Sequence, residues 1–203
     1  MTDDLERRLG AAPDSALDLD AFRSRLGRRA AEDGLLDVAY GTYDSPLGPL
    51  TVVVTPRGLA RLSYPGEGIE AQLDELADRI SPRILEAPEQ TDEVRRQLDA
   101  YFARDRTSFE VAIDWRLVRG FAGNVLRATA RIPFGSVSSY REVAAEAGSP
   151  NAYRAAGNAL GTNPIPIVVP CHRVLHAGGG LGGYTGGLER KRYLLQLEGV
   201  IPA

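Results

Sequence analysis

The stretch Asn163–Val174, which reads NPIPIVVPCHRV, decides how this chain of 203 residues is interpreted. Its aliphatic residues favour burial, while its three prolines remove backbone donors and fix φ. We therefore expect the core to hold this segment stiffly and to deliver its last polar residues, Cys171, His172 and Arg173, to a defined place.

Cys171 is the single cysteine of the chain. An imidazole and a guanidinium follow it directly, and such an electropositive setting lowers the pKa of a thiol and makes the thiolate available. The alternative is that Cys171 is a small buried hydrophobic residue, since free cysteine is among the most buried residue types. The flanking Pro-Cys-His-Arg sequence favours the reactive thiol.

Composition is that of a soluble globular protein, with 43% hydrophobic and 25% charged residues. One cysteine rules out an internal disulfide and fits a reducing compartment. One cysteine and two histidines cannot supply the usual four Cys/His ligands of structural zinc, so we expect no metal. The sequence shows no signal peptide and no run of about 20 apolar residues that could span a membrane. We therefore expect a cytoplasmic protein that does not interact with membranes.

Charge is distributed unevenly along the chain. Residues 121–203 hold eight basic and four acidic side chains, a net charge of +4, whereas the whole chain carries −3 and residues 1–120 therefore carry −7. Such an asymmetry points to a polyanionic partner for the basic half, although charge blocks are often only solvated faces.

The first two regions of the chain are predicted to be structural. Residues 1–36 carry leucines at helix-like spacings, which predict one or two short amphipathic helices with no visible chemistry. Residues 37–115 predict an α+β unit: an antiparallel strand meander, helices at about Ile69–Ile80 and Asp92–Phe102, and a further strand over Phe109–Ile113. Nothing in this unit suggests a catalytic group.

The third region, residues 119–203, is predicted to be mostly helical. A first helix is expected over Gly120–Arg131. Ser139 is the expected N-cap of a helix over Tyr140–Ala147, and Glu142 stands where a capping box needs its acid.

A second short helix is predicted directly after this one. Asn151 is its expected N-cap and Ala152–Leu160 its extent, after a turn of about three residues. Two short helices joined this way resemble a helix-turn-helix, whose second helix meets nucleic acid with its N-terminal residues. Arg154 lies there among small residues, which suit close approach to a duplex but equally suit tight helix packing.

The end of the chain combines a glycine-rich loop with a closing helix. Gly178–Gly187 reads GGGLGGYTGG and lets the backbone pass close to a ligand, although a surface loop is the simpler interpretation. Leu188–Leu197 is predicted to be helical, with Lys191 on its outer face.

Together these motifs resemble the methylated-DNA–protein-cysteine alkyltransferase family, which repairs O6-alkylguanine. The resemblance covers about residues 38–203 and rests on PCHRV at Pro170–Val174. It implies an α+β protein, in which an N-terminal domain with a ribonuclease-H-like antiparallel sheet precedes a mostly helical, winged-helix or helix-turn-helix-like C-terminal domain. Further matching motifs are Asp44–Leu50, Ile132–Gly135, Ser139–Tyr140, Asn163–Pro164, Gly182–Gly187 and Leu194–Gly199.

The resemblance also implies catalytic roles for five residues. Cys171 matches the alkyl acceptor, and Asn163 matches the hinge between the recognition helix and the cysteine segment. His172 and Glu198 match the pair that activates the cysteine through a water molecule. Tyr140 matches the tyrosine that contacts the target nucleotide and can donate a proton to it.

Four more residues match substrate or DNA contacts. Arg154 corresponds to the arginine that enters the base stack where the nucleotide is extruded, and Tyr184 and Thr185 belong to the pocket loop. Arg173 is expected either to contact DNA or to brace the fold. The resemblance implies a monomer that acts once on double-stranded DNA carrying O6-alkylguanine, with no cofactor.

Four other interpretations stay open at the level of sequence. A non-enzymatic relative that binds alkylated DNA and recruits other repair factors lacks the acceptor cysteine. A cysteine hydrolase usually draws its histidine from a distant part of the chain, and a zinc deaminase needs a second cysteine. A plain helix-turn-helix regulator explains neither Cys171 nor the glycine loop.

The chain departs from the family pattern at Ala122, Gly123 and Leu126, in positions that affect packing more than chemistry.

Overall fold

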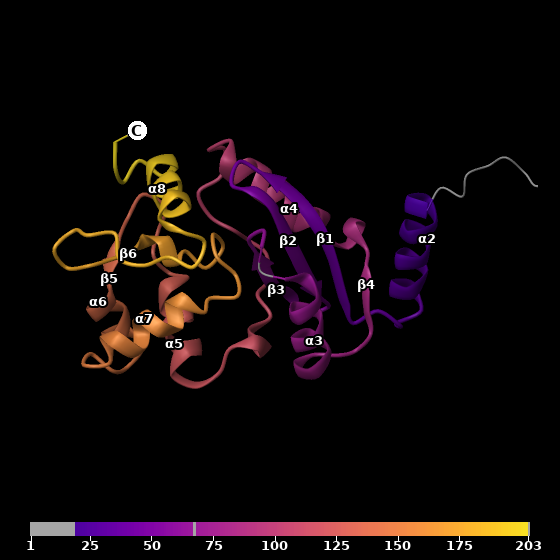
Figure 1. Cartoon of the computed structure of the whole chain (residues 1–203), viewed down its shortest axis with the longest axis horizontal. Coiled ribbons are helices and arrows are strands. Elements are labelled where there is room, and N and C mark those ends of the chain that lie inside the picture. The colour runs from indigo at the N-terminus through magenta and orange to yellow at the C-terminus, as the bar shows by residue number, and fades with distance from the viewer. Residues whose placement is uncertain (1–18, 67, 203) are drawn as a thin grey trace, which may run out of the picture.

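The computed structural model describes residues 19–66 and 68–202. The spacing of Leu5 and Leu9 predicts helix near the N-terminus, and both residues lie outside the described part of the chain, as does Leu17, which begins the later pattern. A later predicted helix is present as α2 (Leu19–Glu32), which lies to one side of the sheet (Figure 1).

A four-stranded sheet forms the centre of the N-terminal half. Its strand order is β3-β2-β1-β4, and the first three strands form the predicted antiparallel meander. The fourth strand pairs parallel to β1 and was not predicted, because it is only three residues long. The strands are β1 (Val38–Ser45), β2 (Gly48–Thr55), β3 (Gly58–Ser63) and β4 (Ile84–Glu86).

The prediction of a strand over Phe109–Ile113 is wrong. This segment touches the sheet through one isolated bridge, between Ile113 and Leu59 of β3, and is otherwise irregular. Alternation of apolar residues was therefore not sufficient to make a strand there, because no further ladder hydrogen bonds follow the bridge.

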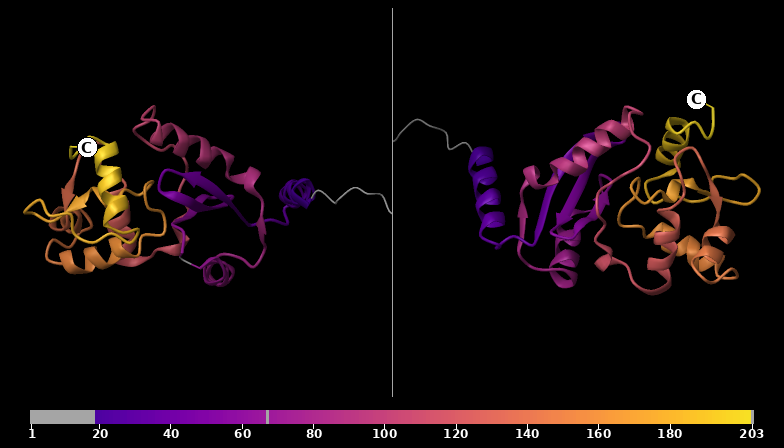
Figure 2. Two further views of the ribbon diagram at one scale, coloured as in Figure 1. Left: turned by 45° about the horizontal axis from the view of Figure 1, so that its top comes forward. Right: turned by 180° about the vertical axis from the view of Figure 1, so that it is seen from behind.

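The helices of this half agree with the prediction. They are α3 (Ile69–Arg79) and α4 (Asp92–Phe102), with 3₁₀ turns at Pro88–Thr91 and Trp115–Leu117. Phe102, at the end of α4, stacks on Tyr43 of β1 at 6.5 Å between ring centroids, so α4 packs against the sheet (Figure 2).

The C-terminal half is helical. A small parallel ladder, β5 (Ser138–Ser139) with β6 (Val174–Leu175), ties the start of α6 to the residues that follow the cysteine turn. Its α-helices are α5 (Gly120–Thr129), α6 (Tyr140–Glu146), α7 (Tyr153–Gly161) and α8 (Leu188–Leu197), and a 3₁₀ turn spans Cys171–Arg173.

The predicted helix pair α6–α7 is present, with differences at its turn. The capping box is confirmed, since Ser139 Oγ accepts from the N–H of Glu142 and the Glu142 carboxylate accepts from the N–H of Ser139. The connection is six residues long rather than about three, because Gly148 turns the chain at φ 88° and a second turn follows it. Asn151 is not the cap of α7; Ala152 holds that position without a side-chain bond.

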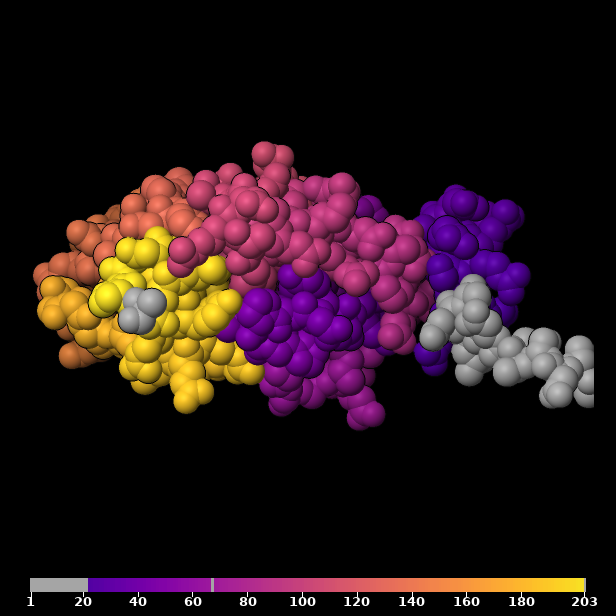
Figure 3. Space-filling model, turned by 90° about the horizontal axis from the view of Figure 1, so that it is seen from above, coloured from indigo at the N-terminus to yellow at the C-terminus, as the bar shows by residue number. Residues whose placement is uncertain are grey.

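One apolar core runs through both halves of the molecule. It joins residues of the sheet, such as Leu50 and Leu62, with residues of the helical half, such as Val125 and Leu194. The N–H of Leu62, on the edge strand β3, also donates to the carbonyl of Pro164 at 2.8 Å. Figure 3 shows the two halves in continuous contact. Among the described residues, no helix is both long and apolar enough to cross a membrane.

Candidate active site

Cys171 begins a 3₁₀ turn at the end of the proline-rich segment, as expected of a segment held by the core. Ile165, Ile167 and Val169 of that segment are at most 1% exposed. The side chain of Asn163 fixes the turn: its Nδ2 donates to the carbonyl of Val169 at 2.8 Å and lies 3.1 Å from Cys171 Sγ. Its Oδ1 accepts from the N–H of Ile165 at 3.0 Å, so one amide links both ends of the segment.

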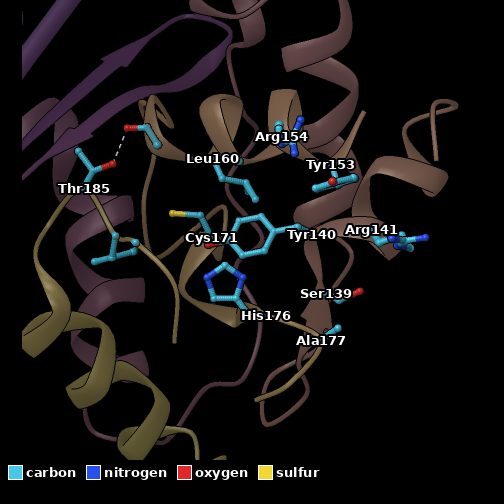
Figure 4. Close-up of a pocket in the computed structure, with 14 residues that line it drawn as sticks. Ser139, Tyr140, Arg141, Tyr153, Arg154, Leu160, Cys171, His176, Ala177 and Thr185 are labelled. Atoms are coloured by element: carbon cyan, nitrogen blue, oxygen red, sulfur yellow. Dashed lines mark hydrogen bonds between the residues drawn. The ribbon is translucent and has the colours of Figure 1, made fainter. Parts of the chain in front are cut away.

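A cavity of about 770 Å³ opens beside the thiol. Figure 4 shows the sulfur of Cys171 and the ring of Tyr140 near its centre, next to His176, while Arg141, Tyr153 and Arg154 lie to one side. The lining also includes Ser139, Gly157, Leu160, Gly161, Ala177, Gly183, Tyr184 and Thr185. The cavity thus brings together residues from β5, α6, α7, the cysteine turn and the glycine loop.

The thiol is not the acidic group that its neighbours in sequence suggest. Cys171 is 5% exposed, and burial raises its pKa to about 11. The Asn163 amide and, more weakly, the Lys191 ammonium oppose this shift. The expectation of a lowered pKa is therefore wrong for the protein by itself, because desolvation of the thiolate outweighs the charges nearby.

The Glu198 carboxylate is the centre of a buried hydrogen-bond network. It lies 2.8 Å from His172 Nε2 and accepts from the hydroxyl of Tyr101 at 2.6 Å. Bonds from His172 and Arg173 hold its pKa at about 2 despite burial. Burial also lowers the pKa of His172, so the imidazole is neutral, and its Nδ1 is buried without a hydrogen-bond partner among the described residues.

Arg173 braces the fold and does not face the cavity. It is 6% exposed. Its Nε–H donates to Glu198 Oε2 at 2.8 Å, and its Nη2 donates to Glu198 Oε1 at 2.9 Å. A third nitrogen, Nη1, donates to the carbonyl of Ile132. Of the two roles expected for Arg173, these three bonds and a side chain only 7% exposed fit the one that braces the fold.

Arg154, by contrast, is exposed near the start of α7, where a nucleic-acid contact was expected. Its guanidinium carbon lies 5.6 Å from the ring centroid of Tyr153, and that of Arg141 lies at the same distance. Two cations and an aromatic ring therefore stand together at the cavity's edge. Arg141 and Tyr153 were missed in the sequence because their grouping depends on the angle between α6 and α7.

Tyr140 lies inside the cavity against the glycine loop. A Cβ on Gly182 would lie 2.5 Å from its hydroxyl, and Gly182 has φ 67°, so this position requires glycine. The Tyr140 ring lies 5.2 Å from the imidazole of His176. Burial raises the pKa of Tyr140, with a smaller effect from Cys171, so the phenol keeps its proton near neutral pH. His176 was missed as a pocket residue, since no family motif contains it.

Tyr184 and Thr185 line the cavity from the glycine loop, as predicted. Thr185 donates to the carbonyl of Gly161 at the end of α7. Tyr184 lies with its hydroxyl 2.7 Å from that of Tyr64, a residue of the N-terminal half. Tyr64 and Tyr101 were both missed, because residues 37–115 were expected to contribute no groups to the site.

Lys191 is another correction. It was predicted on the outer face of α8, yet it is completely buried and donates to the carbonyls of Val174 and Leu181. Burial lowers its pKa to about 8, while the nearby Cys171 opposes that shift. Across the described residues, no group of three or more His, Cys, Asp and Glu side chains could hold a metal ion.

Two family models match this chain. Residues 38–115 match the ribonuclease-like domain of 6-O-methylguanine DNA methyltransferase, and residues 120–200 match its DNA-binding domain. The chain is similar to methylated-DNA–protein-cysteine methyltransferases of Mycobacterium tuberculosis (41% identity over 161 residues) and Methanosarcina acetivorans (37% over 160 residues). Both matches cover 79% of this chain, with 92% of the first protein and 97% of the second.

Solved structures agree with these matches. The crystal structure of Mycobacterium tuberculosis O6-methylguanine methyltransferase superposes with a TM-score of 0.68 at 41% identity, and covers 82% of this chain and 96% of its own. A structure of the M. tuberculosis protein in complex with DNA gives the same TM-score over 81% of this chain and 96% of its own. The α+β fold, the site and the sequence matches agree, and the chain belongs to the 6-O-methylguanine DNA methyltransferase family.

Proposed function

We propose that this protein repairs O6-alkylguanine in DNA by moving the alkyl group irreversibly to Cys171. The observation that carries the proposal is the position of the thiol: the family's acceptor cysteine lines a cavity of about 770 Å³ that also holds Tyr140. A methylated O6 lies inside the duplex, so the nucleotide must leave the base stack to reach this cavity, at a cost of a few kcal/mol.

Activation of the thiol is assigned to His172 and Glu198. The carboxylate orients the imidazole through Nε2, so that Nδ1 is free to accept a proton. Adjacent side chains of one turn do not face each other, and the sequence predicts that a water molecule carries the proton from Cys171 to His172. The Asn163 amide, 3.1 Å from the sulfur, stabilises the thiolate that results.

The transfer step forms a carbon–sulfur bond and breaks the bond between the alkyl carbon and O6. The electron pair of that broken bond passes to the guanine ring, and Tyr140 donates the proton that neutralises it. His172 then releases the thiol proton to solvent, and solvent returns a proton to the tyrosine. The product is an uncharged thioether with no route back, so each molecule reacts once.

Binding of double-stranded DNA is assigned to the α6–α7 pair. Arg154 is exposed at the cavity's edge and is long enough to fill the space that the extruded nucleotide leaves. We also assign residues 37–115 to an N-terminal domain and residues 119–203 to the alkyltransferase domain. The protein is proposed to act as a monomer in the cytoplasm, where a single thiol stays reduced.

Intact mass and peptide mapping test the proposal, after the protein is mixed with a duplex that contains one O6-methylguanine. We expect a stoichiometric gain of one methyl group on the peptide that contains Cys171, and no gain in Cys171→Ser. Binding to the lesion without a change in mass would support a lesion-recognition protein instead. The absence of both binding and transfer would contradict both functions.

A further inference from the structure

Two tyrosines meet where the N-terminal sheet contacts the alkyl pocket. Tyr64 directly follows β3, the edge strand nearest the C-terminal helices (Figure 1), and is 4% exposed. Its hydroxyl lies 2.7 Å from that of Tyr184, and the rings meet edge-on at 6.1 Å. Tyr184 lines the cavity that holds Cys171. The pair is therefore a direct connection from the sheet to the wall of the pocket.

Neighbouring residues hold Tyr64 in this place. The guanidinium carbon of Arg190 lies 4.8 Å from the centroid of its ring, while Arg190 donates to the carbonyls of Gly186 and Leu47. A Cβ on Gly186 would lie 2.5 Å from the Tyr64 ring and 2.9 Å from that of Tyr184. The loop thus has glycine where the two rings need room to meet.

The position of the Tyr184 ring within the glycine loop depends on such an anchor. Tyr184 lies between Gly182–Gly183 and Gly186–Gly187, and glycine gives a backbone little conformational preference of its own. A hydrogen bond from a well-packed sheet residue then limits where the Tyr184 ring can lie. If Tyr64 loses its hydroxyl, the hydroxyl of the partly buried Tyr184 loses this partner and the Tyr184 ring is free to move.

We propose that Tyr64 is a positioning residue, which fixes Tyr184 as a wall of the pocket and so limits the size of the alkyl group that Cys171 accepts. This inference rests on the proposed function. It gives the N-terminal half a part in substrate selection, although that half contributes no group to the bond that is formed or broken.

The test compares two alkyl groups in the variant Tyr64→Phe, which removes one hydroxyl. Second-order rate constants for transfer are measured on one duplex sequence that carries either O6-methylguanine or O6-benzylguanine. We expect transfer of methyl to slow about three- to tenfold, the effect of one hydrogen bond. Benzyl needs a wider pocket, so its transfer should not slow, and the benzyl-to-methyl ratio rises at least about threefold.

Tyr43→Phe is the matched control. Tyr43 is also a buried tyrosine of the sheet, and its hydroxyl donates to Asp99 at 2.8 Å, away from the lining of the cavity. This variant should leave the benzyl-to-methyl ratio unchanged. In a double-mutant cycle, Tyr64→Phe should add no further change in a Tyr184→Phe background, because its effect passes through Tyr184.

Each outcome decides between the claims. The inference is overturned if the benzyl-to-methyl ratio is unchanged in Tyr64→Phe, or if the effects of Tyr64→Phe and Tyr184→Phe are additive. The proposed function survives either result, provided that the wild-type protein takes up methyl. Wild-type protein that takes up no alkyl group from either duplex overturns the proposed function, and the inference with it. Thermal melting of each variant separates a local change in the pocket from loss of the folded state.

Discussion

The guanidinium of Arg173 binds the carboxylate of Glu198 side-on, with Nε at 2.8 Å from one oxygen and Nη2 at 2.9 Å from the other. The same carboxylate holds the imidazole of His172, so both residues that follow the reactive cysteine are fixed by one acid near the end of the chain. A bidentate pair adds geometric specificity to its charge. The orientation of the catalytic turn therefore depends on residue 198.

Replacement of this acid should affect stability and activation together. In Glu198→Gln the Arg173 charge is buried without its counter-ion, which costs about 3–5 kcal/mol of unfolding free energy. Urea denaturation measures this change. We also expect methyl transfer to slow by at least about tenfold, because His172 loses the group that orients it. Full transfer activity in a folded variant would contradict this role.

Acid should destabilise the wild-type protein through the same carboxylate. The folded-state pKa of Glu198 is about 2, below its ordinary value of 4.5, so the stabilisation is complete above about pH 4.5 and is lost as pH falls toward 2. Unfolding free energies measured by denaturant titration between pH 6 and pH 3 should fall. In Glu198→Gln this fall should be smaller. An equal slope for both proteins would show that other carboxylates dominate.

Reactivity of the thiol should rise with pH. The pKa of Cys171 is about 11, so its thiolate fraction rises about tenfold per pH unit at neutral pH, and alkylation by iodoacetamide should follow. Loss of the Lys191 proton near pH 8 should flatten the rise above that pH.

Lys191→Met should slow alkylation below pH 8, where the ammonium of the wild-type protein is charged, and should have less effect above pH 9. Arg192→Met, an exposed cation on the same helix, is the control and should leave the rates unchanged. A uniform change at every pH would show that Lys191 acts through structure and not through its charge.

Loss of Arg154 should slow alkyl transfer from DNA but not from the free base. In Arg154→Ala we expect methyl transfer from a duplex to slow about 10- to 100-fold, because no side chain then fills the space that the extruded nucleotide leaves in the base stack. Reaction with free O6-benzylguanine should stay within about twofold, because this base needs no extrusion. Single-turnover kinetics measure both, with Arg192→Ala as the control for a general loss of positive charge. Equal losses on both substrates would place Arg154 in the pocket chemistry.

Removal of the Asn163 amide should loosen the cysteine turn. Asn163→Ala leaves the buried N–H of Ile165 unpaired, at about 1–3 kcal/mol, while the carbonyl of Val169 keeps its bond from the N–H of Cys171. The thiol also loses a donor that lowers its pKa, so iodoacetamide alkylation at pH 8 should slow. Thermal melting and alkylation rates check the two effects separately.

The sequence predicted those elements that local interactions decide. Helix α4 begins and ends where its periodicity predicts, and the capping box at Ser139 depends on residues three positions apart. The strand expected over Phe109–Ile113 failed because a strand needs a partner along its whole length, which periodicity does not report.

Features of the site that the sequence did not predict arise from long-range contacts. Lys191 is buried because two loop carbonyls, of Val174 and Leu181, meet its ammonium, and charge alone had placed it outside. Tyr64 and Tyr101 reach the site from the N-terminal half, 120 and 97 residues from the partners that they bond. The roles assigned to Asn163, His172 and Tyr140 stay predictions until variants are measured.

Concealment of the thiol gives the protein a long chemical lifetime before use. A reagent that reacts once is wasted by any small electrophile that it meets in solution. With Cys171 only 5% exposed and protonated at neutral pH, such encounters are rare and slow. An alkylated base that is extruded into the cavity is held beside the sulfur, at a high effective concentration. Selectivity for the alkylated base thus comes partly from the low reactivity of the free protein toward small electrophiles.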